Sequence, residues 1–219
     1  MLRFHLITLF PEACDAYLSA SILGRAREQK KVKVDYQSPR DFVTNKWGKV
    51  DERPYGGGPG MVMTALPVVK AVKKSLSRRK GNIAVVWFTP GAKAFDNQEA
   101  DMLRTYDDVV LVCGRYEGID ARAKDIMHTF GDVHEYSVGE AVYTGGELPA
   151  MIIVDAVTRR IPGVLGKDES VEERRIASRD VYTRPEVITW EKKEYAVPEV
   201  LRTGNHAAID TFRLGEKGV

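Results

Sequence analysis

The sequence predicts an α/β protein with a mostly parallel sheet, and three observations support this. Strand-like and helix-like segments alternate along most of the chain, as they do in proteins built from parallel βαβ units. NIAVVWF (82–88) and DVVLVCG (108–114) are apolar runs rich in β-branched residues, which is typical of strands buried on both faces. GELPAMIIVDAVTRR (146–160) is apolar enough to form a largely buried helix against such a sheet.

The other elements follow from local patterns. KVKVDYQ (31–37) alternates apolar and polar residues, like a half-exposed strand. Basic residues at the end of 65–80 complement a helix dipole, and Asp96 is a suitable N-cap for the helix that follows it. In chain order we expect a strand over 2–9, helical sequence through 29, a strand over 31–37, a helix over 65–80, a strand over 82–88, a helix over 96–104, a strand over 108–114, a helix near 118–128, a strand near 131–138 and a helix over 146–160.

The composition is that of an ordinary globular protein. Of the 219 residues, 43% are hydrophobic and 29% are charged, and the formal net charge is only +2, so any site for a polyanion must be a local patch. Cys14 and Cys113 have neither metal-binding nor redox spacing. The first residues do not resemble a signal peptide, and no apolar run is long enough to span a bilayer. We therefore expect a soluble cytoplasmic protein.

The composition changes after Gly163. The segment GKDESVEERRIASRD (166–180) is charged and nearly free of large apolar residues, which predicts a flexible linker. The residues that follow are too few to form an independent core. We therefore expect a main domain over 1–163, a charged linker over 164–184 and a short, mainly helical extension over 185–219.

The segment RPYGGGPGM (53–61) is unusually rich in glycine and proline. Glycine permits a positive φ and lets another molecule approach the main chain closely. The segment is not a phosphate-binding P-loop, because Met61, rather than a lysine, follows Gly60. Arg53 and Tyr55 offer an anion contact and a stacking surface. Taken alone, the segment is still more typical of a plain surface loop.

Three further loops, each following an expected strand, combine glycine with polar or aromatic residues. They are WFTPGA (87–92), CGRYEGID (113–120) and YSVGEAVYTGGELPA (136–150). Loops at the carboxyl ends of parallel strands are where ligands bind in α/β proteins. Together these loops would leave main-chain donors and acceptors open to a flat heterocycle. Three tight turns without a ligand explain the pattern about equally well.

These stretches, with DAVTRRIPGVLG (155–166) and YTRPEV (182–187), closely resemble the bacterial tRNA (guanine-N1)-methyltransferases of the SPOUT superfamily. The resemblance runs from the first strand into GNHAAIDTFR (204–213), so it covers nearly the whole chain. Five long motifs in the same order are far more specific than one glycine cluster. The resemblance implies a SPOUT-type parallel sheet with a deep trefoil knot in the C-terminal half, which periodicity cannot predict.

The resemblance also implies the ligands. The cofactor would be S-adenosylmethionine, held in a bent form mainly by backbone groups of the three loops. RPYGGGPGM would lie beside its methyl group and approach the target guanine. The implied cofactor-binding residues are Thr89, Pro90, Gly114, Tyr116, Glu117, Ser137, Val138, Gly139, Glu140, Ala141, Val142, Tyr143, Gly145, Gly146 and Pro149. The implied substrate-binding residues are Arg53, Tyr55, Gly56, Gly57, Gly58, Gly60 and Arg115.

Methylation of guanine N1 requires two catalytic roles. A base must take the N1 proton, and a carboxylate placed on that proton suits this role. Negative charge then grows on O6, where a guanidinium stabilises the transition state. Arg159 matches the family's arginine for the second role. A cation at the end of a helix also complements the helix dipole, which is the structural alternative for Arg159.

The sequence departs from the family at the general base. The family places an aspartate in an Asp-Ser-Phe element, but ungapped alignment from IPGVLG puts Arg174 at that position. An arginine cannot take a proton at neutral pH. We therefore assign the base to Glu173, ahead of Glu172 and Asp180. A solvated charged segment without a catalytic role explains these residues about equally well.

Two functional hypotheses follow. In the first, a homodimer with active sites at the subunit interface methylates the guanine immediately 3′ of the tRNA anticodon, position 37, and the short C-terminal extension binds tRNA. In the second, a binding protein of the same fold keeps its affinity for cofactor and RNA but transfers methyl groups poorly, because of Arg174. Some family members need Mg²⁺, although no set of ligands in this sequence indicates a metal site.

Overall fold

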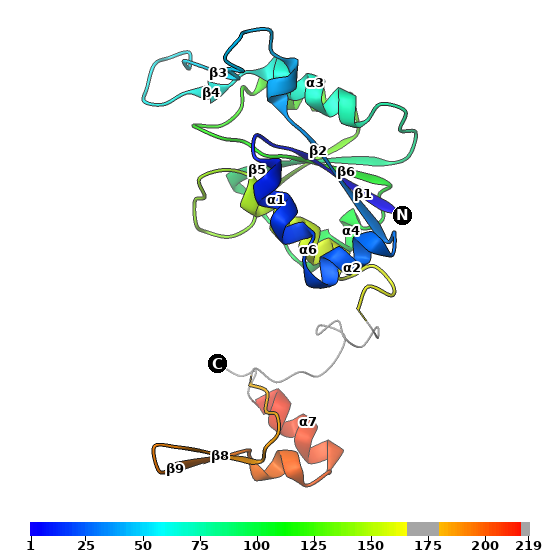
Figure 1. Ribbon diagram of the computed structural model, residues 1–219, viewed down its shortest axis with the longest axis vertical. Coiled ribbons are helices and arrows are strands. Elements are labelled where there is room, and N and C mark those ends of the chain that lie inside the picture. The colour runs from blue at the N-terminus through cyan, green and yellow to red at the C-terminus, as the bar shows by residue number, and fades with distance from the viewer. Residues whose placement is uncertain (166–179, 216–219) are drawn as a thin grey trace. The chain divides into compact units, whose positions relative to one another are not determined.

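The computed structural model describes residues 1–165 and 180–215, which belong to two compact units (Figure 1). The larger unit comprises residues 1–165, and the smaller one falls within residues 166–219. The elements of the larger unit are β1 (Leu2–Ile7), α1 (Pro11–Leu18), α2 (Ser21–Glu28), β2 (Val32–Gln37), the 3₁₀ turn η1 (Pro39–Phe42), β3 (Asp51–Glu52), β4 (Val62–Met63), α3 (Ala65–Ser75), β5 (Ile83–Ala94), α4 (Asn97–Leu103), β6 (Asp108–Val112), α5 (Arg122–Met127), β7 (Asp132–Ser137) and α6 (Glu147–Thr158).

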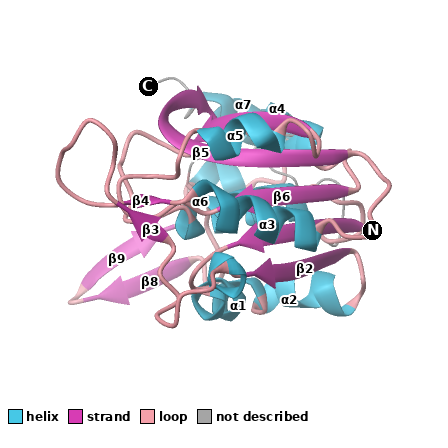
Figure 2. Cartoon of the chain, turned by 90° about the horizontal axis from the view of Figure 1, so that it is seen from above, coloured by secondary structure: helices cyan, strands magenta, loops and turns pink. Residues whose placement is uncertain are grey.

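A five-stranded sheet with the order β2-β1-β6-β5-β7 forms the centre of the larger unit (Figure 2). Every neighbouring pair of strands in it is parallel, so the predicted α/β architecture is confirmed. Because the strands run in one direction, their carboxyl ends meet at one edge of the sheet. The loops that follow β6 and β7 therefore leave from the same edge. Together with the stretch 87–92, where β5 leaves its pairing with β7, they are the three loops predicted from the sequence.

Both faces of the sheet are covered, which explains the continuous apolar runs. In β6, Val109 and Leu111 pack into an apolar cluster with α1, α2, α4 and α6, whereas Val110 and Val112 face a second cluster with α3 and α5. Figure 1 shows α3 on one side of the sheet and α1, α2 and α6 on the other. Alternate side chains of one strand thus enter two different cores, as expected for a central parallel strand.

Strand β5 differs from its prediction because it does not end at residue 88. It pairs with β7 through Phe88, leaves the ladder, and pairs again from Lys93 to Ala94. The predicted turn at WFTPGA therefore exists as an excursion within one long strand. Pro90 lies in this excursion, where its missing N–H costs no ladder hydrogen bond.

Two helical predictions also needed correction. The predicted first helix is divided into α1 and α2, and Gly24 makes the tight junction possible, because a Cβ there would lie 2.2 Å from the carbonyl oxygen of Ser19. The helix expected over 65–80 ends at Ser75, and Arg78 beyond it has a φ of +70°. Positive φ is incompatible with a continuing right-handed helix.

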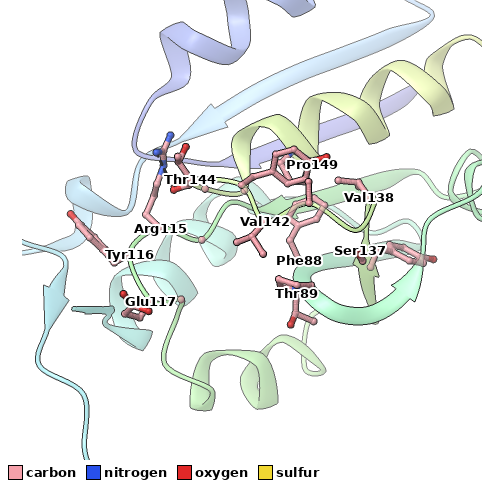
Figure 3. Close-up of a pocket in the computed structure, with 18 residues that line it drawn as sticks. Phe88, Thr89, Arg115, Tyr116, Glu117, Ser137, Val138, Val142, Thr144 and Pro149 are labelled. Carbon is pink, nitrogen blue, oxygen red and sulfur yellow. Dashed lines mark hydrogen bonds between the residues drawn. The ribbon is translucent and has the colours of Figure 1, made fainter. Parts of the chain in front are cut away.

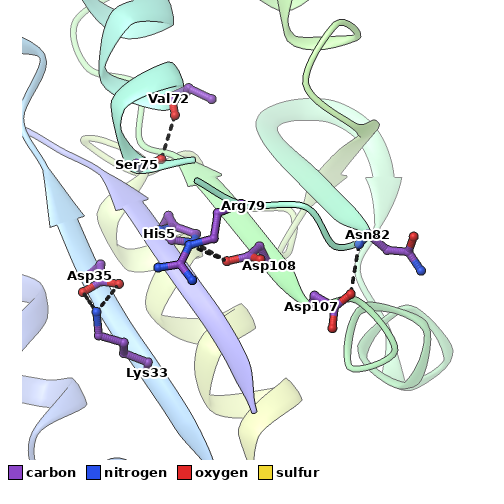
Figure 4. A network of polar contacts seen from close by, with 9 residues as sticks. All are labelled: His5, Lys33, Asp35, Val72, Ser75, Arg79, Asn82, Asp107 and Asp108. Atoms are coloured by element: carbon purple, nitrogen blue, oxygen red, sulfur yellow. Dashed lines mark hydrogen bonds and ion pairs between the residues drawn. The ribbon is translucent and has the colours of Figure 1, made fainter. Parts of the chain in front are cut away.

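A buried polar cluster lies toward the edge of the sheet opposite the three loops (Figure 4). The Nε2 atom of His5 is 2.7 Å from Oδ1 of Asp108, and both residues are only 1% exposed. The Nε atom of Arg79 lies 3.8 Å from the same oxygen. Asp108 begins β6, so this cluster and the loop after β6 are separated by the length of the strand.

The smaller unit contains strands as well as helices, so the prediction of a mainly helical extension was incomplete. Its described elements are β8 (Val187–Trp190), β9 (Lys193–Ala196), the 3₁₀ turn η4 (Glu199–Arg202) and α7 (His206–Gly215). The two strands form an antiparallel hairpin, and the turn residues Glu191 and Lys192 both have positive φ. A two-residue turn in which both residues have positive φ matches the right-handed twist of the two strands that it connects.

Candidate functional site

A pocket with a volume of about 280 Å³ is formed by the excursion within β5, the loops after β6 and β7, and the start of α6 (Figure 3). All of the predicted cofactor-binding residues line this pocket except Gly139 and Glu140. The structure therefore brings the three loops together, as the sequence predicts. The lining residues are Phe88, Thr89, Pro90, Gly114, Arg115, Tyr116, Glu117, Gly118, Tyr136, Ser137, Val138, Ala141, Val142, Tyr143, Thr144, Gly145, Gly146 and Pro149.

Gly145 and Gly146 allow the loop before α6 to lie directly against the loop after β6. A Cβ on Gly146 would be 2.7 Å from the Cα atom of Cys113, and one on Gly145 would be 2.4 Å from Nε of Arg115. The amide of Gly146 donates a hydrogen bond of 2.8 Å to the carbonyl of Gly114. A side chain at Gly146 would clash with the backbone of the segment after β6, whereas one at Gly145 would displace the Arg115 side chain.

Tyr136 forms part of the pocket floor and is held from behind. Its ring makes an edge contact with Phe95, with centroids 5.4 Å apart, and its hydroxyl donates a hydrogen bond to Glu99. Burial, reinforced by the Glu99 hydrogen bond, raises the pKa of the Tyr136 phenol. Tyr136 therefore supplies an uncharged aromatic surface. Neither Tyr136 nor Phe88 was among the predicted site residues, although both lie within the stretches 87–92 and 136–150 from which the other site residues were chosen.

Gly139 and Glu140 lie at the exposed tip of the loop after β7 rather than in the pocket wall. The φ of Gly139 is +147°, and its carbonyl accepts a hydrogen bond of 2.7 Å from the hydroxyl of Ser137. The Tyr143 hydroxyl would lie 3.7 Å from a Cβ placed on Gly139. Gly139 thus shapes the turn that brings Ser137 and Tyr143 to the pocket, while Glu140 remains a prediction without a pocket contact.

The glycine-rich segment 53–61 is an exposed loop that connects β3 and β4. Its four glycines all adopt positive φ values, which other residues rarely reach. They are Gly56 (+83°), Gly57 (+77°), Gly58 (+114°) and Gly60 (+84°). No other group lies within 4 Å of a Cβ placed at positions 56, 57 or 58, so the main chain there is open to a ligand.

The base of this glycine loop is attached to the pocket. The amide of Glu117 donates to the carbonyl of Met61 at 3.0 Å, and the amide of Met63 donates to the carbonyl of Gly118 at 2.9 Å. A Cβ on Gly60 would be 2.5 Å from a carboxylate oxygen of Glu117. The same segment that lines the pocket therefore holds the glycine loop beside it.

The three predicted substrate-binding residues that are not glycine, Arg53, Tyr55 and Arg115, differ in their exposure to solvent. Tyr55 is 99% exposed on the glycine loop, and Arg53 is exposed at its start. Arg115 lines the pocket, but its guanidinium is engaged by the protein, with Nε 2.9 Å from a carboxylate oxygen of Glu147. Tyr55 and Arg53 are thus available to a ligand in a way that Arg115 is not.

Of the two predicted catalytic residues, only Arg159 lies within the described residues, and it does not line the pocket. Arg159 caps the carboxyl end of α6, whereas the pocket contacts the amino end of that helix. The helix has 12 residues, so at 1.5 Å per residue its two ends are about 18 Å apart. Glu173 lies outside the described residues, as do Glu172 and Arg174, and Asp180 is exposed at the start of the second described range.

Other candidate sites are few. Within residues 1–165 and 180–215, no cluster of His, Cys, Asp and Glu has the arrangement of a metal site. Neither of these ranges contains a helix that is long and apolar enough to cross a membrane. Cys14 and Cys113 are buried free thiols, and burial raises the pKa of Cys14 to about 11. The pocket and the glycine loop therefore form the best-supported functional site in this part of the chain.

Comparison with known proteins identifies the family. The family model described as tRNA (Guanine-1)-methyltransferase TrmD matches residues 2–218 of this chain. The chain belongs to the tRNA (guanine-N1)-methyltransferase family. Curated members named tRNA (guanine-N(1)-)-methyltransferase include those of Clostridioides difficile, 42% identical over 98% of this chain and 92% of the relative, and Mannheimia succiniciproducens, 42% identical over 95% and 80%. That of Buchnera aphidicola is 39% identical over 96% of this chain and 87% of the relative.

Family membership supports tRNA guanine-N1 methylation, the reaction of the first functional hypothesis. The relatives carry the name of an enzyme, and the match to the tRNA (guanine-N1)-methyltransferase family spans the pocket, the glycine loop and the smaller unit. Nothing in the comparisons supports the second hypothesis, a binding protein with impaired methyl transfer. The departure at Arg174 therefore concerns how the base is supplied rather than whether the chain is an enzyme.

Proposed function

We propose that this protein transfers a methyl group from S-adenosylmethionine to N1 of the guanine immediately 3′ of the tRNA anticodon, position 37. One observation carries the proposal: a pocket walled by main chain opens beside an exposed glycine loop, in a member of the tRNA (guanine-N1)-methyltransferase family. The pocket suits a flat donor, and the loop suits an RNA nucleotide that must approach the main chain closely.

The pocket residues fit the cofactor. Gly145 and Gly146 leave the wall formed by 113–118 without side chains in front of it, and Tyr136 and Phe88 supply apolar surface. Aromatic and main-chain groups together bind a planar heterocycle without needing a charged contact. When bound, S-adenosylmethionine would supply the electrophilic methyl group, and breaking of its bond to sulfur would leave S-adenosylhomocysteine.

The chain's own residues perform the proton and charge chemistry. We propose that the carboxylate of Glu173 is the general base. It removes the proton from N1 as the new N–CH₃ bond forms. Electron density from the broken N1–H bond spreads toward O6, where the guanidinium of Arg159 stabilises it. Protonated Glu173 then returns its proton to solvent. Tyr55 offers a ring on which a neighbouring base can stack.

The position of Arg159 favours an active site shared by two subunits. Arg159 lies ten residues after Pro149, the last residue of α6 that lines the pocket, which is about 15 Å along the helix at 1.5 Å per residue, so it is remote from a base bound in its own chain's pocket. In a symmetric dimer, two copies of α6 that pack in opposite directions would each place this arginine near the partner's pocket. The family's homodimer is consistent with this arrangement.

An exposed apolar stripe on α6 supports the same dimer. Leu148 and Ile152 are 46% and 36% exposed, and Tyr17 of α1 is 50% exposed beside them, with its hydroxyl bonded to Asp155. Positions 148, 152, 155 and 159 follow the spacing of one helix face. A partner that covers this apolar stripe would therefore also cover Arg159.

The remaining expectations rest on the family resemblance. We propose that the loops after β5, β6 and β7 form the crossings of a trefoil knot, and that the protein acts in the cytoplasm. We also propose that residues 1–163 form the methyltransferase domain, 164–184 the linker and 185–219 a tRNA-binding extension. The cation–π contact of Lys193 with Tyr195, at 5.2 Å, places a positive charge and an aromatic ring together in the hairpin.

Transfer of a labelled methyl group tests the proposed function. Tritiated S-adenosylmethionine is incubated with tRNA transcripts that carry guanine or adenine at the position immediately 3′ of the anticodon. We expect label only in the guanine transcript, recovered as N1-methylguanosine. Equal label in both transcripts would refute the assigned position. Measurable cofactor binding without any transfer would instead support a binding protein.

A further inference from the structure

Glu147 is a buried carboxylate next to the pocket, and the proposed chemistry does not use it. The residue is the first of α6 and is 4% exposed. Its Oε1 atom accepts a hydrogen bond of 2.8 Å from the hydroxyl of Thr8, and its Oε2 atom lies 2.9 Å from Nε of Arg115. A charge at such a depth is costly unless it is paired. We therefore look for a role of the buried Glu147 carboxylate other than stabilising the fold.

Arg115 is fixed on several sides by the same small region. Its NH1 group donates to the carbonyl of Thr144 at 3.3 Å, and the two residues lie close together in Figure 3. Its Cζ atom is 4.6 Å from the centre of the Phe10 ring. Gly145 leaves room for the side chain, since a Cβ there would be 2.4 Å from Nε. With its side chain 25% exposed, Arg115 has little freedom to turn toward a ligand.

The contact between Glu147 and Arg115 joins three chain segments at the pocket edge of the sheet. Thr8 follows β1, Arg115 follows β6, and Thr144 precedes α6. Within the described ranges neither Nε of Arg115 nor Oε2 of Glu147 has an aligned hydrogen-bond partner, so their contact is electrostatic. It is the charge of Glu147, more than its shape, that holds Arg115.

The constraint on Arg115 extends to the substrate side of the site. Gly114, Tyr116 and Glu117, its neighbours in the chain, line the pocket. The same segment holds the glycine loop through the main-chain bonds of Glu117 and Gly118 to Met61 and Met63. Displacement of Arg115 would therefore move both the cofactor wall and the base of the glycine loop.

We propose that Glu147 is a positioning residue that acts through Arg115 to hold the segment 114–118 in the geometry that binds S-adenosylmethionine. This inference rests on the proposed function. It also gives Arg115 a different role from the substrate contact that the family resemblance implies, because its guanidinium acts on the protein's own loops. For stability alone, a buried ion pair has little advantage over an apolar pair, which favours a role in geometry.

A double-mutant cycle in which the affinity for S-adenosylmethionine is measured tests this inference. The variants are Glu147→Gln, which keeps the size and the acceptor for Thr8, Arg115→Gln, and the two combined. Titration calorimetry gives the dissociation constant for S-adenosylmethionine. We expect each single variant to raise it about tenfold, and the double variant to be no weaker than either single one, because a coupled pair is broken only once.

A surface pair provides the matched control. Lys124 and Glu135 are also 2.9 Å apart but lie outside the pocket lining, so Glu135→Gln should leave the affinity unchanged. Thermal melting of every variant separates positioning from folding. Lower melting temperatures with wild-type affinity would overturn the inference and leave Glu147 with a purely structural role. Independent, multiplying losses of affinity in the double variant would also overturn it.

Two further outcomes are distinguishable. If the wild-type protein binds no S-adenosylmethionine, the proposed function fails and the inference falls with it. If the wild-type protein binds the cofactor and Glu147→Gln does not fold, Arg115→Gln decides, because that side chain is partly exposed. An unchanged affinity in a folded Arg115→Gln protein would overturn the inference while leaving the proposed function intact.

Discussion

Gly146 lies directly against Cys113, where the start of α6 meets the segment after β6 beside the pocket. A Cβ on Gly146 would be 2.7 Å from the Cys113 Cα and 2.9 Å from the Gly114 nitrogen. The φ of Gly146 is −79°, a value open to any residue, so the contact rather than the dihedral requires glycine. The neighbouring atoms belong to the backbone and cannot turn aside as a flexible side chain would. The width of the pocket therefore depends on this one position.

Gly146→Ala should weaken both the fold and the cofactor site. The added methyl group forces the loop after β6 away from the start of α6, and we expect a loss of about 1–3 kcal/mol in the free energy of unfolding. The dissociation constant for S-adenosylmethionine should rise with it. Gly91→Ala is the matched control, because no other group lies within 4 Å of a Cβ there. Wild-type melting and affinity in Gly146→Ala would contradict the packing described for this wall.

The His5–Asp108 cluster should make stability depend on pH. Burial lowers the pKa of His5 below its ordinary value of 6.5, even though Asp108 acts in the opposite direction. Below that value the unfolded chain binds a proton that the folded protein resists, so stability should fall as the pH drops through about 6.5. The slope contributed by one histidine is at most about 1.4 kcal/mol per pH unit.

Melting of the wild type and of His5→Gln at about pH 7.5 and 5.5 measures this effect. The drop on acidification should be smaller in the variant. Burial also lowers the pKa of His134, but His134 is present in both proteins, so its contribution cancels in the comparison. Equal drops in both proteins would show that His5 does not titrate differently on folding.

Arg159→Ala should reduce turnover without weakening cofactor binding, because Arg159 is remote from the pocket of its own chain. Loss of a guanidinium that stabilises charge on O6 is expected to lower kcat about 10²-fold or more. Methyl transfer and calorimetric titration of the same preparation measure the two quantities. A parallel loss of cofactor affinity would place Arg159 in a structural role at the end of α6.

Co-expression of two inactive variants tests whether each site is shared by two subunits. One subunit carries Arg159→Ala, and the other carries Gly145→Trp, which blocks the pocket. Hybrid dimers would contain one complete site, so random pairing should restore about a quarter of the wild-type activity. No recovery, in dimers shown to be hybrid, would mean that Arg159 serves its own chain or none.

Glu173→Gln tests the assignment of the general base. If Glu173 takes the N1 proton, kcat should fall about 10²–10⁴-fold while the dissociation constant of the cofactor stays unchanged. Glu172→Gln, one residue earlier, is the control and should transfer methyl groups normally. Wild-type methyl transfer in Glu173→Gln would remove Glu173 from the mechanism, and a loss in the control instead would assign the base to Glu172.

The parallel sheet could be predicted from the sequence because strands that are buried on both faces consist of continuous apolar runs. All five residues of β6 are buried, and its apolar run could not belong to a solvent-facing strand. The pocket loops could also be predicted, because they combine glycine with polar and aromatic residues near the carboxyl ends of expected strands. Gly146 is the clearest example, since it lies where two main chains touch.

Other features depend on contacts between distant residues. Tyr136 reaches the pocket because Phe95 and Glu99 hold its ring, and neither is near it in the sequence. The engagement of Arg115 by Glu147 required the end of β6 to meet the start of α6. A glycine-flanked arginine otherwise resembles a phosphate contact, and only its buried partner distinguishes the two roles.

A crystal structure of the protein grown with saturating S-adenosylmethionine tests the central claim most directly. We predict that the adenine lies between the segments 88–90 and 137–146, with its edge on main-chain groups near Gly114, and that the methyl group on the cofactor's sulfur faces the glycine loop. Cofactor bound elsewhere, or this pocket empty at saturation, would contradict the account.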